Sequence, residues 1–189
     1  MSLLYGAEAL NHKASADKNK PDEIIRSLEI RKSSIIVDIG AGGGYYSIRF
    51  AEETGLGGEV YAVDVNGDFL QHIDSQAKND GLTNIKTVLV EEKAKGLPER
   101  GCDLIFFRNI YHHIHQPEAY FKEIKRFLKP NGRIAVIDYK KINGFSFINL
   151  IGHFVNEIDM IAVLENVGFT PIKSFDFLPK QSFNIFQLK

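Results

Sequence analysis

Short apolar runs alternate with longer amphipathic stretches along this chain, and this alternation limits the possible folds more than any other feature. The amphipathic stretches have apolar residues at helical spacing, as in 45–54 and 117–128. Strands that alternate with helices form a parallel sheet whose two faces are covered. The runs that have the length and apolar content of buried strands are 34–40, 58–65, 84–91, 102–109 and 133–139.

The end of the chain follows a different pattern. Residues 172–179 and 182–189 alternate apolar with polar side chains and are joined by a turn. This pattern predicts an antiparallel hairpin at one edge of the sheet. With the hairpin, the predicted sheet has seven strands and is mostly parallel. We expect one domain over residues 1–189, in which 1–20 form an N-terminal extension.

Composition excludes several classes of protein. The formal net charge is −1, and lysine and arginine do not gather in any segment, so we expect no nucleic-acid partner. No apolar stretch approaches the ~20 residues that span a bilayer, so we expect no membrane segment. Cys102 is the only cysteine, which rules out an intrachain disulfide and suits a reducing cytoplasm.

A glycine-rich segment, Asp38-Ile39-Gly40-Ala41-Gly42-Gly43-Gly44, overlaps the end of the first predicted strand and continues beyond it. Such a loop lets the backbone approach a ligand closely. The dinucleotide pattern G-x-G-x-x-G would need glycine at position 45, which is Tyr45. Asp38 would repel a pyrophosphate but attract a cation, and S-adenosylmethionine carries an ammonium and a sulfonium without any phosphate. Alternatively, Asp38 caps amides of its own loop.

Acidic residues also end the next two strands. Asp64 is placed to accept the hydroxyls of a ribose, a role that nicotinamide and methionine cofactors share. Glu91 or Glu92 is placed to meet an adenine amino group. The alternative for these two glutamates is an exposed position at the start of a loop.

Four motifs in order carry a family resemblance: "IIVDIGAGGG", "VYAVDV", "DLIFF" and "NIYHHIHQPEAYFKEIKRFLKPNGRIAVIDY". From about residue 21 to the end, the chain resembles class I S-adenosylmethionine-dependent methyltransferases of the small, single-domain bacterial and archaeal type. The resemblance implies an α/β, Rossmann-like, doubly wound sheet of seven strands, mostly parallel, with a C-terminal antiparallel hairpin. It also implies S-adenosylmethionine as cofactor and S-adenosylhomocysteine as product.

The resemblance implies a role for each matching residue. The methionine end of the cofactor would meet the loop and the end of the fourth strand, and the nucleoside would meet the ends of the second and third strands. The loop residues are Asp38, Gly40, Ala41 and Gly42, the nucleoside residues are Asp64, Val65, Glu91 and Glu92, and the fourth-strand residues are Arg108 and Asn109.

Aromatic and histidine residues follow the fourth strand, where parallel sheets bind ligands. We take His113 and Tyr111 as candidates for catalysis, because a histidine with a near-neutral pKa can remove a proton from the acceptor. The alternative is that His112 and His113 only order this loop. No acid or cysteine completes a metal site with His112, His113 and His115, so we expect no metal.

The motifs that the chain lacks limit the possible classes of methyl acceptor. The Asn/Asp-Pro-Pro-aromatic run of base-methylating enzymes is replaced by Arg108-Asn109-Ile110-Tyr111, which favours a small molecule, and residues 142–160 are the expected lid. A non-catalytic sensor or partner subunit that binds S-adenosylmethionine or its product is the alternative function. A nicotinamide-dependent oxidoreductase is disfavoured by Tyr45. The sequence leaves the oligomeric state open.

Overall fold

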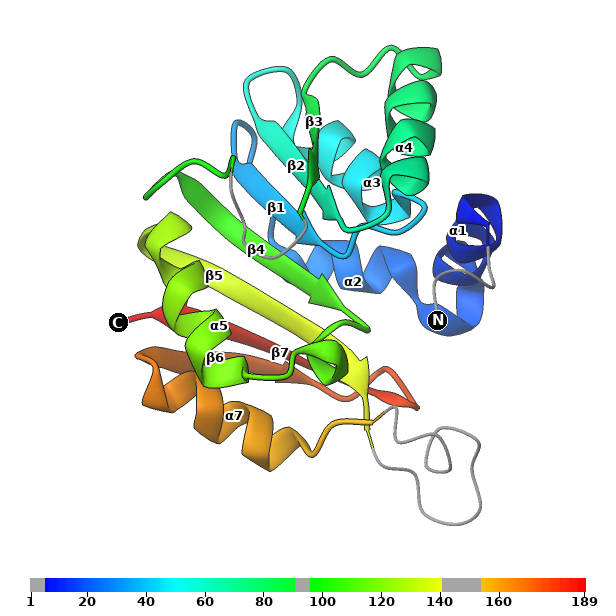
Figure 1. The fold of residues 1–189 in the computed structure, drawn as a ribbon. Coiled ribbons are helices and arrows are strands. Elements are labelled where there is room, and N and C mark those ends of the chain that lie inside the picture. Colours follow the sequence, from blue (N-terminus) through cyan, green and yellow to red (C-terminus); the bar gives the residue numbers. More distant parts are fainter. Residues whose placement is uncertain (1–5, 91–95, 141–153) are drawn as a thin grey trace. The chain divides into compact units, whose positions relative to one another are not determined.

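The computed structural model describes residues 6–90, 96–140 and 154–189. The chain divides into two compact units, Met1–Pro98 and Glu99–Lys189. Each unit contains part of the sheet and the helices that pack on it (Figure 1).

The first unit contains three parallel strands in the order β3-β2-β1. Helices α3 and α4 pack against these strands, and α1 contacts α3. The elements of this unit are α1 (Ala7–Ser15), η2 (Asp17–Asn19), α2 (Pro21–Leu28), β1 (Ile35–Ile39), α3 (Tyr45–Thr54), β2 (Glu59–Asp64), α4 (Gly67–Asn79) and β3 (Ile85–Leu89).

Strand position explains the apolar pattern in this unit. Strands β1 and β2 are buried over most of their length, as expected for inner strands of a covered parallel sheet. Strand β3 is at the edge and mixes half-buried with exposed positions. The predicted helix after the glycine loop is confirmed: it begins after Gly44 (φ +89°) and ends at Gly55 (φ +67°), where left-handed backbone favours glycine.

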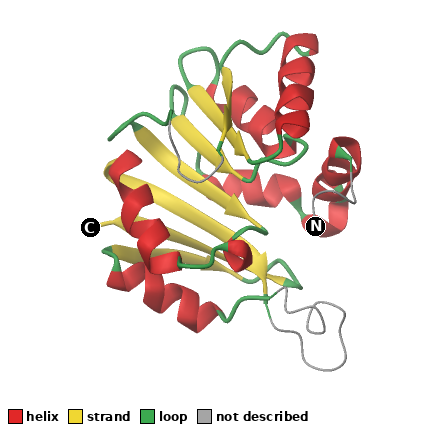
Figure 2. Cartoon of the chain, viewed as in Figure 1, coloured by secondary structure: helices red, strands yellow, loops and turns green. Residues whose placement is uncertain are grey.

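The second unit contains four strands in the order β4-β5-β7-β6. Strands β4 and β5 are parallel, whereas β7 is antiparallel to both β5 and β6, so the predicted hairpin is confirmed. Figure 2 shows the helices of this unit beside its strands. The elements are β4 (Cys102–Arg108), η3 (Tyr111–His113), α5 (Pro117–Ile124), η4 (Lys125–Phe127), β5 (Leu128–Tyr139), α7 (Glu157–Asn166), β6 (Phe169–Phe175) and β7 (Gln181–Leu188).

The fifth strand begins earlier than its sequence pattern predicts. The turn expected at 130–132 lies inside β5, which already pairs with Cys102 at Leu128 and pairs again between Leu104 and Arg133. The extra residues form a bulge in which Asn131 has φ +65°. The amphipathic pattern of the preceding helix therefore runs on into a short 3-10 turn and the start of a strand.

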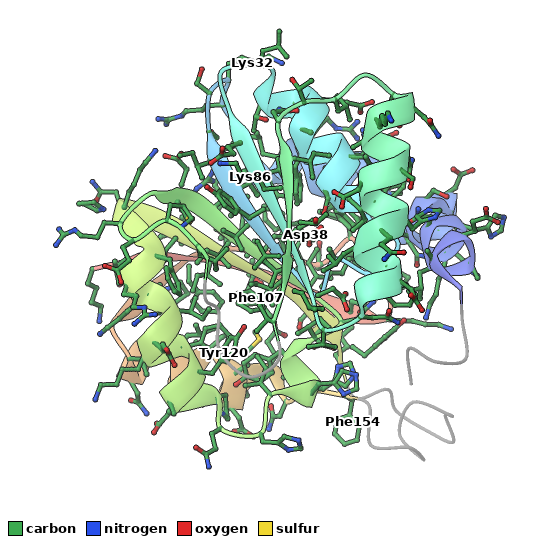
Figure 3. The ribbon with its side chains drawn as sticks, turned by 45° about the horizontal axis from the view of Figure 1, so that its top comes forward. Lys32, Asp38, Lys86, Phe107, Tyr120 and Phe154 are labelled. Carbon is green, nitrogen blue, oxygen red and sulfur yellow. The ribbon has the colours of Figure 1, made fainter. Side chains whose placement is uncertain are left out.

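Aromatic side chains form much of the core of the second unit. Phe107 of β4 is fully buried and meets Phe121 of α5 with ring centroids 5.2 Å apart. Tyr120 meets the same Phe107 ring edge-on, at 6.1 Å, and both residues are labelled in Figure 3. This packing fixes α5 and the loop that leads into it from β4.

The seven strands follow the order β3-β2-β1-β4-β5-β7-β6. The predicted fold, a mostly parallel α/β sheet with an antiparallel C-terminal pair, is confirmed. The prediction of a single domain over 1–189 stays a prediction.

Candidate functional site

The glycine loop between β1 and α3 is held against the end of β2. The amides of Gly40 and Ala41 donate to the carbonyl of Val63 at 2.8 and 3.0 Å. Gly40 and Gly42 have φ values of +72° and +55°, a region that favours glycine. Residues 40–42 keep part of their surface exposed, so this half of the loop is accessible to a ligand.

Asp64 lies beside the accessible half of the loop. Its Oδ2 accepts the backbone N–H of Gly42 at 2.8 Å, and its Oδ1 accepts the backbone N–H of Asn66 at 2.9 Å. A carboxylate has about four lone-pair sites, so each oxygen keeps capacity for one more donor. The two amides fix the orientation of the carboxylate.

Apolar side chains stand next to Asp64. Val65 is 73% exposed, and Leu89, which pairs with Asp64 across β2 and β3, is 54% exposed. Apolar side chains beside a small number of polar groups are typical of small-molecule sites.

Asp38, labelled in Figure 3, is the last residue but one of β1. Its exposed fraction is 3%. Its Oδ2 accepts the hydroxyl of Ser47, which is fully buried in α3, at 2.6 Å. The structure thus gives Asp38 a side-chain partner in the following helix. A buried negative charge acts on a ligand with less screening than a charge on the surface.

The other half of the loop is closed by protein. A Cβ on Gly43 would lie 2.2 Å from the carbonyl oxygen of Ala7, and a Cβ on Gly44 would lie 2.4 Å from Cγ1 of Ile73. These two glycines serve the packing of α1 and α4 on the loop. The ligand-accessible part is therefore Gly40 to Gly42, the part that the sequence singled out.

Helix α1, predicted only as part of an extension, contributes a residue that sequence reasoning missed. Nδ2 of Asn11 donates to the carbonyl of Gly43 at 2.7 Å, and Oδ1 of Asn11 accepts the N–H of Tyr45 at 3.1 Å. Helix α1 has no buried residues, so the sequence around Asn11 has no apolar periodicity that would mark its side chain as important.

In the second unit, Arg108 and Asn109 lie at the end of β4, as predicted. Asn109 has left-handed backbone (φ +58°), and its N–H donates to Ile137 of β5 at 2.8 Å. Its Oδ1 accepts Nε2 of Gln181 at 2.5 Å. The side chain of Asn109 therefore ties the end of β4 to the start of β7.

A buried imidazole–carboxylate pair follows. Nδ1 of His112 lies 2.7 Å from Oδ1 of Asp138, and the backbone N–H of His112 donates to Oδ2 at 3.1 Å. The two side chains are 6% and 0% exposed. Asp138 was missed by the sequence reasoning, although it lies one residue before the end of an apolar strand.

The two predicted catalytic residues differ in their surroundings. His113 is exposed, and its ring centroid lies 4.1 Å from that of His112. Tyr111 is 8% exposed and stacks on Phe121. Burial, together with the charges of Asp159 and Asp138, raises the pKa of Tyr111 to about 12. Tyr111 therefore stays protonated near neutral pH and is suited to donate a hydrogen bond rather than to remove a proton.

Some expected features fall outside the described residues, namely Glu91, Glu92 and the part of the lid up to 153.

Within residues 6–90, 96–140 and 154–189, no three His, Cys, Asp or Glu side chains are grouped in a way that would bind a metal ion. In the same ranges, every helix is too short or too polar to cross a bilayer.

Known proteins share this fold. A solved structure of an S-adenosylmethionine-dependent methyltransferase from Aquifex aeolicus matches with a TM-score of 0.85 at 21% identity, covering 97% of each chain. A methyltransferase from Burkholderia thailandensis, solved with 1,6-didemethyltoxoflavin and S-adenosylhomocysteine, matches with a TM-score of 0.71 at 19% identity, covering 94% of this chain and 80% of that one.

Sequence comparison gives the family. The ubiquinone/menaquinone biosynthesis C-methyltransferase UbiE of Pseudoalteromonas translucida is 28% identical over 120 residues, which are 63% of this chain and 48% of that protein. The match thus spans about half the length of this curated relative. A family model described as a methyltransferase domain matches residues 30–170. The chain therefore belongs to the methyltransferase domain family, as its motifs predict.

Proposed function

We propose that the chain is an S-adenosylmethionine-dependent methyltransferase that acts on a small-molecule acceptor and releases S-adenosylhomocysteine. The observation that carries the proposal is the orientation of Asp64 by two backbone amides, beside the accessible glycines and the exposed Val65. The proposed roles of Asp38, Gly40, Ala41 and Gly42 rest on the same arrangement.

The residues of the first unit fit an adenosine derivative. Ribose hydroxyls are donors, and Asp64 keeps acceptor capacity on both oxygens. Val65 and Leu89 offer apolar surface for adenine. The buried charge of Asp38 favours the ammonium and sulfonium of a methionine group over an anion.

The start of α3 supports a cofactor without a pyrophosphate. In dinucleotide-binding folds, the pyrophosphate meets free amides at the start of the helix that follows the glycine loop. In this chain, the N–H of Tyr45 at that position donates to Asn11, and Gly43 is covered by Ala7. Both contacts would have to break before a diphosphate reached these amides.

Methyl transfer from a sulfonium needs few catalytic side chains. When bound, S-adenosylmethionine supplies a methyl group on a sulfonium, which is already an activated leaving group. The protein has to hold and align the reactants. We assign that task to Asp64 and the loop, and the family resemblance adds Arg108 and Asn109 as proposed cofactor contacts. His113 is the proposed acceptor of a proton from the substrate, with Tyr111 as a hydrogen-bond donor.

A small-molecule acceptor is supported by two kinds of argument. The sequence lacks the motif of base-methylating enzymes and any basic cluster. UbiE is named for ubiquinone and menaquinone biosynthesis, and the enzyme from Burkholderia was solved with 1,6-didemethyltoxoflavin. We expect the reaction in the cytoplasm, because a chain with one cysteine needs no oxidising compartment.

A turnover assay tests the proposal. The purified chain is incubated with S-adenosylmethionine and a panel of metabolites that includes phenols, quinols and heterocyclic amines, and release of S-adenosylhomocysteine is measured. The proposal predicts acceptor-dependent release with at least one member. Binding of the cofactor without turnover on any acceptor of a broad panel would favour a non-catalytic sensor or partner subunit.

A further inference from the structure

We propose that Asn11 is a positioning residue for the cofactor. Its carboxamide holds the glycine loop in the conformation that binds the ligand, so that helix α1 is part of the cofactor site. This inference rests on the proposed function, because it assigns a new residue to the same site.

The two hydrogen bonds of Asn11 lie on either side of Gly44, at the end of the loop. Nδ2 donates to the carbonyl of Gly43 at 2.7 Å, and Oδ1 accepts the N–H of Tyr45 at 3.1 Å. Between these groups lies Gly44, whose φ of +89° begins helix α3. A single side chain thus satisfies one acceptor and one donor on either side of a left-handed residue, which fixes the peptide planes around it.

The constraint passes directly to the predicted ribose anchor. Gly43 follows Gly42, and the N–H of Gly42 donates to Oδ2 of Asp64 at 2.8 Å. A rotation of the peptide after Gly43 would also move the peptide before it, because neighbouring residues share the same backbone. Asn11, Gly43, Gly42 and Asp64 therefore form a continuous chain of contacts.

The fit between α1 and the loop is close. A Cβ on Gly43 would lie 2.2 Å from the carbonyl of Ala7 and 2.3 Å from Oδ1 of Asn11, and a Cβ on Gly42 would lie 3.3 Å from Cδ1 of Leu10. No residue of α1 itself is buried, so apolar burial contributes little to its attachment. The two hydrogen bonds of Asn11 therefore do most to fix the position of α1 against the loop.

The test compares matched variants of the full chain by calorimetric titration with S-adenosylhomocysteine. Asn11→Ala removes both hydrogen bonds, and we expect the Kd to rise about ten- to a hundredfold. Asn11→Asp keeps an acceptor for Tyr45 but turns a carboxylate oxygen towards the carbonyl oxygen of Gly43, which repels it, so its Kd is expected to be at least as high as that of Asn11→Ala. Because α1 contains no buried residue, both variants are expected to fold, which circular dichroism checks.

A control variant distinguishes the loss of the Asn11 hydrogen bonds from a loss of helix stability in α1. Ala9→Gly lies on the exposed side of α1 and weakens the helix without touching the loop, so its Kd is expected within about twofold of wild type. With an acceptor in hand, Asn11→Ala should raise the KM for S-adenosylmethionine while leaving kcat at saturation nearly unchanged.

Two results would overturn the inference: an Asn11→Ala variant that binds like the wild type, or an Ala9→Gly variant that loses as much affinity as Asn11→Ala. A wild-type chain that does not bind S-adenosylhomocysteine would instead contradict the proposed function.

Discussion

The backbone N–H of Gly42 donates to Oδ2 of Asp64 at 2.8 Å, although 22 positions separate the two residues in the chain. The contact joins the accessible part of the glycine loop to the end of the neighbouring strand. Because Oδ1 accepts the N–H of Asn66 at 2.9 Å, both oxygens of Asp64 are fixed before any ligand arrives. The first unit therefore presents a preorganised acceptor beside a hydrogen-bonded glycine loop.

Replacing Asp64 by asparagine is expected to weaken cofactor binding. The substitution removes the charge and forces an NH₂ group against one of two backbone N–H donors. We expect the affinity for S-adenosylhomocysteine to fall by about 1.5–3 kcal/mol, the scale of a charge-assisted hydrogen bond. Isothermal titration calorimetry measures the change.

Asp68→Asn is the matched control, since Asp68 is exposed in the first turn of α4. Its affinity should stay within about 0.5 kcal/mol of wild type, as for an ordinary surface substitution. Unchanged affinity in Asp64→Asn would remove Asp64 from the site.

Ser47→Ala is expected to lower stability. The substitution removes a 2.6 Å hydrogen bond to the buried carboxylate of Asp38. Hydrogen bonds to charged groups contribute about 1.5–3 kcal/mol, so the free energy of unfolding should fall by that amount. Urea denaturation provides the measurement. A loss below about 0.5 kcal/mol would show that the other surroundings of Asp38 suffice.

The two neighbouring histidines are expected to separate into a structural and a functional residue. His112→Ala removes the partner that lies 2.7 Å from the fully buried Asp138, so it should destabilise the fold by about 2–4 kcal/mol. His113 is exposed, and His113→Ala should change stability by less than about 0.5 kcal/mol.

If His113 removes the substrate proton, kcat of His113→Ala should fall by about 10²–10⁴-fold. Denaturation and steady-state assays on the same preparations distinguish these effects. A fully active His113→Ala variant would exclude His113 as the base.

Stability is expected to fall at high pH because of two tyrosines, the buried Tyr111 and the half-buried Tyr120. Burial raises the pKa of Tyr111, with the charges of Asp159 and Asp138, and that of Tyr120, with the charge of Glu123, from 10.0 to about 12. The unfolded chain releases these protons near pH 10, whereas the folded chain keeps them to about pH 12. Their contribution is therefore complete below pH 10 and is lost as the pH rises towards 12.

Urea denaturation between pH 8 and 12 tests this expectation. The Tyr111→Phe/Tyr120→Phe variant should lose less stability over that window than the wild type. Equal losses in both proteins would contradict the raised pKa values.

The fold was predictable from sequence because its signals are local. The apolar runs of β1, β2 and β4 are nearly continuous, and Gly55 ends α3 with the conformation that glycine favours. The start of β5 was not predictable, because pairing with β4 extends the strand back to Leu128 through a bulge. The Pro-Asn-Gly segment still bends, with Asn131 at φ +65°, but it does so as a bulge inside the strand.

The candidate site divides in the same way. Asp38, Gly42 and Asp64 carry a spacing that can be read along the chain, and the structure places them around one loop. Asn11 and Asp138 were missed because no motif or spacing in the sequence links them to their partners, which are Gly43 for Asn11 and His112 for Asp138. A single polar residue gives no periodic signal that would distinguish it from a solvated one.

The most direct measurement for the central claim is the ligand-dependent melting temperature of the wild-type chain. At a hundredfold excess over Kd, a ligand of the folded state adds about 2.7 kcal/mol, or about 5–10 °C for a chain of this size. We predict that S-adenosylmethionine and S-adenosylhomocysteine raise the melting temperature and that NAD does not. A rise with NAD alone would contradict a loop built for a phosphate-free, cationic adenosine derivative.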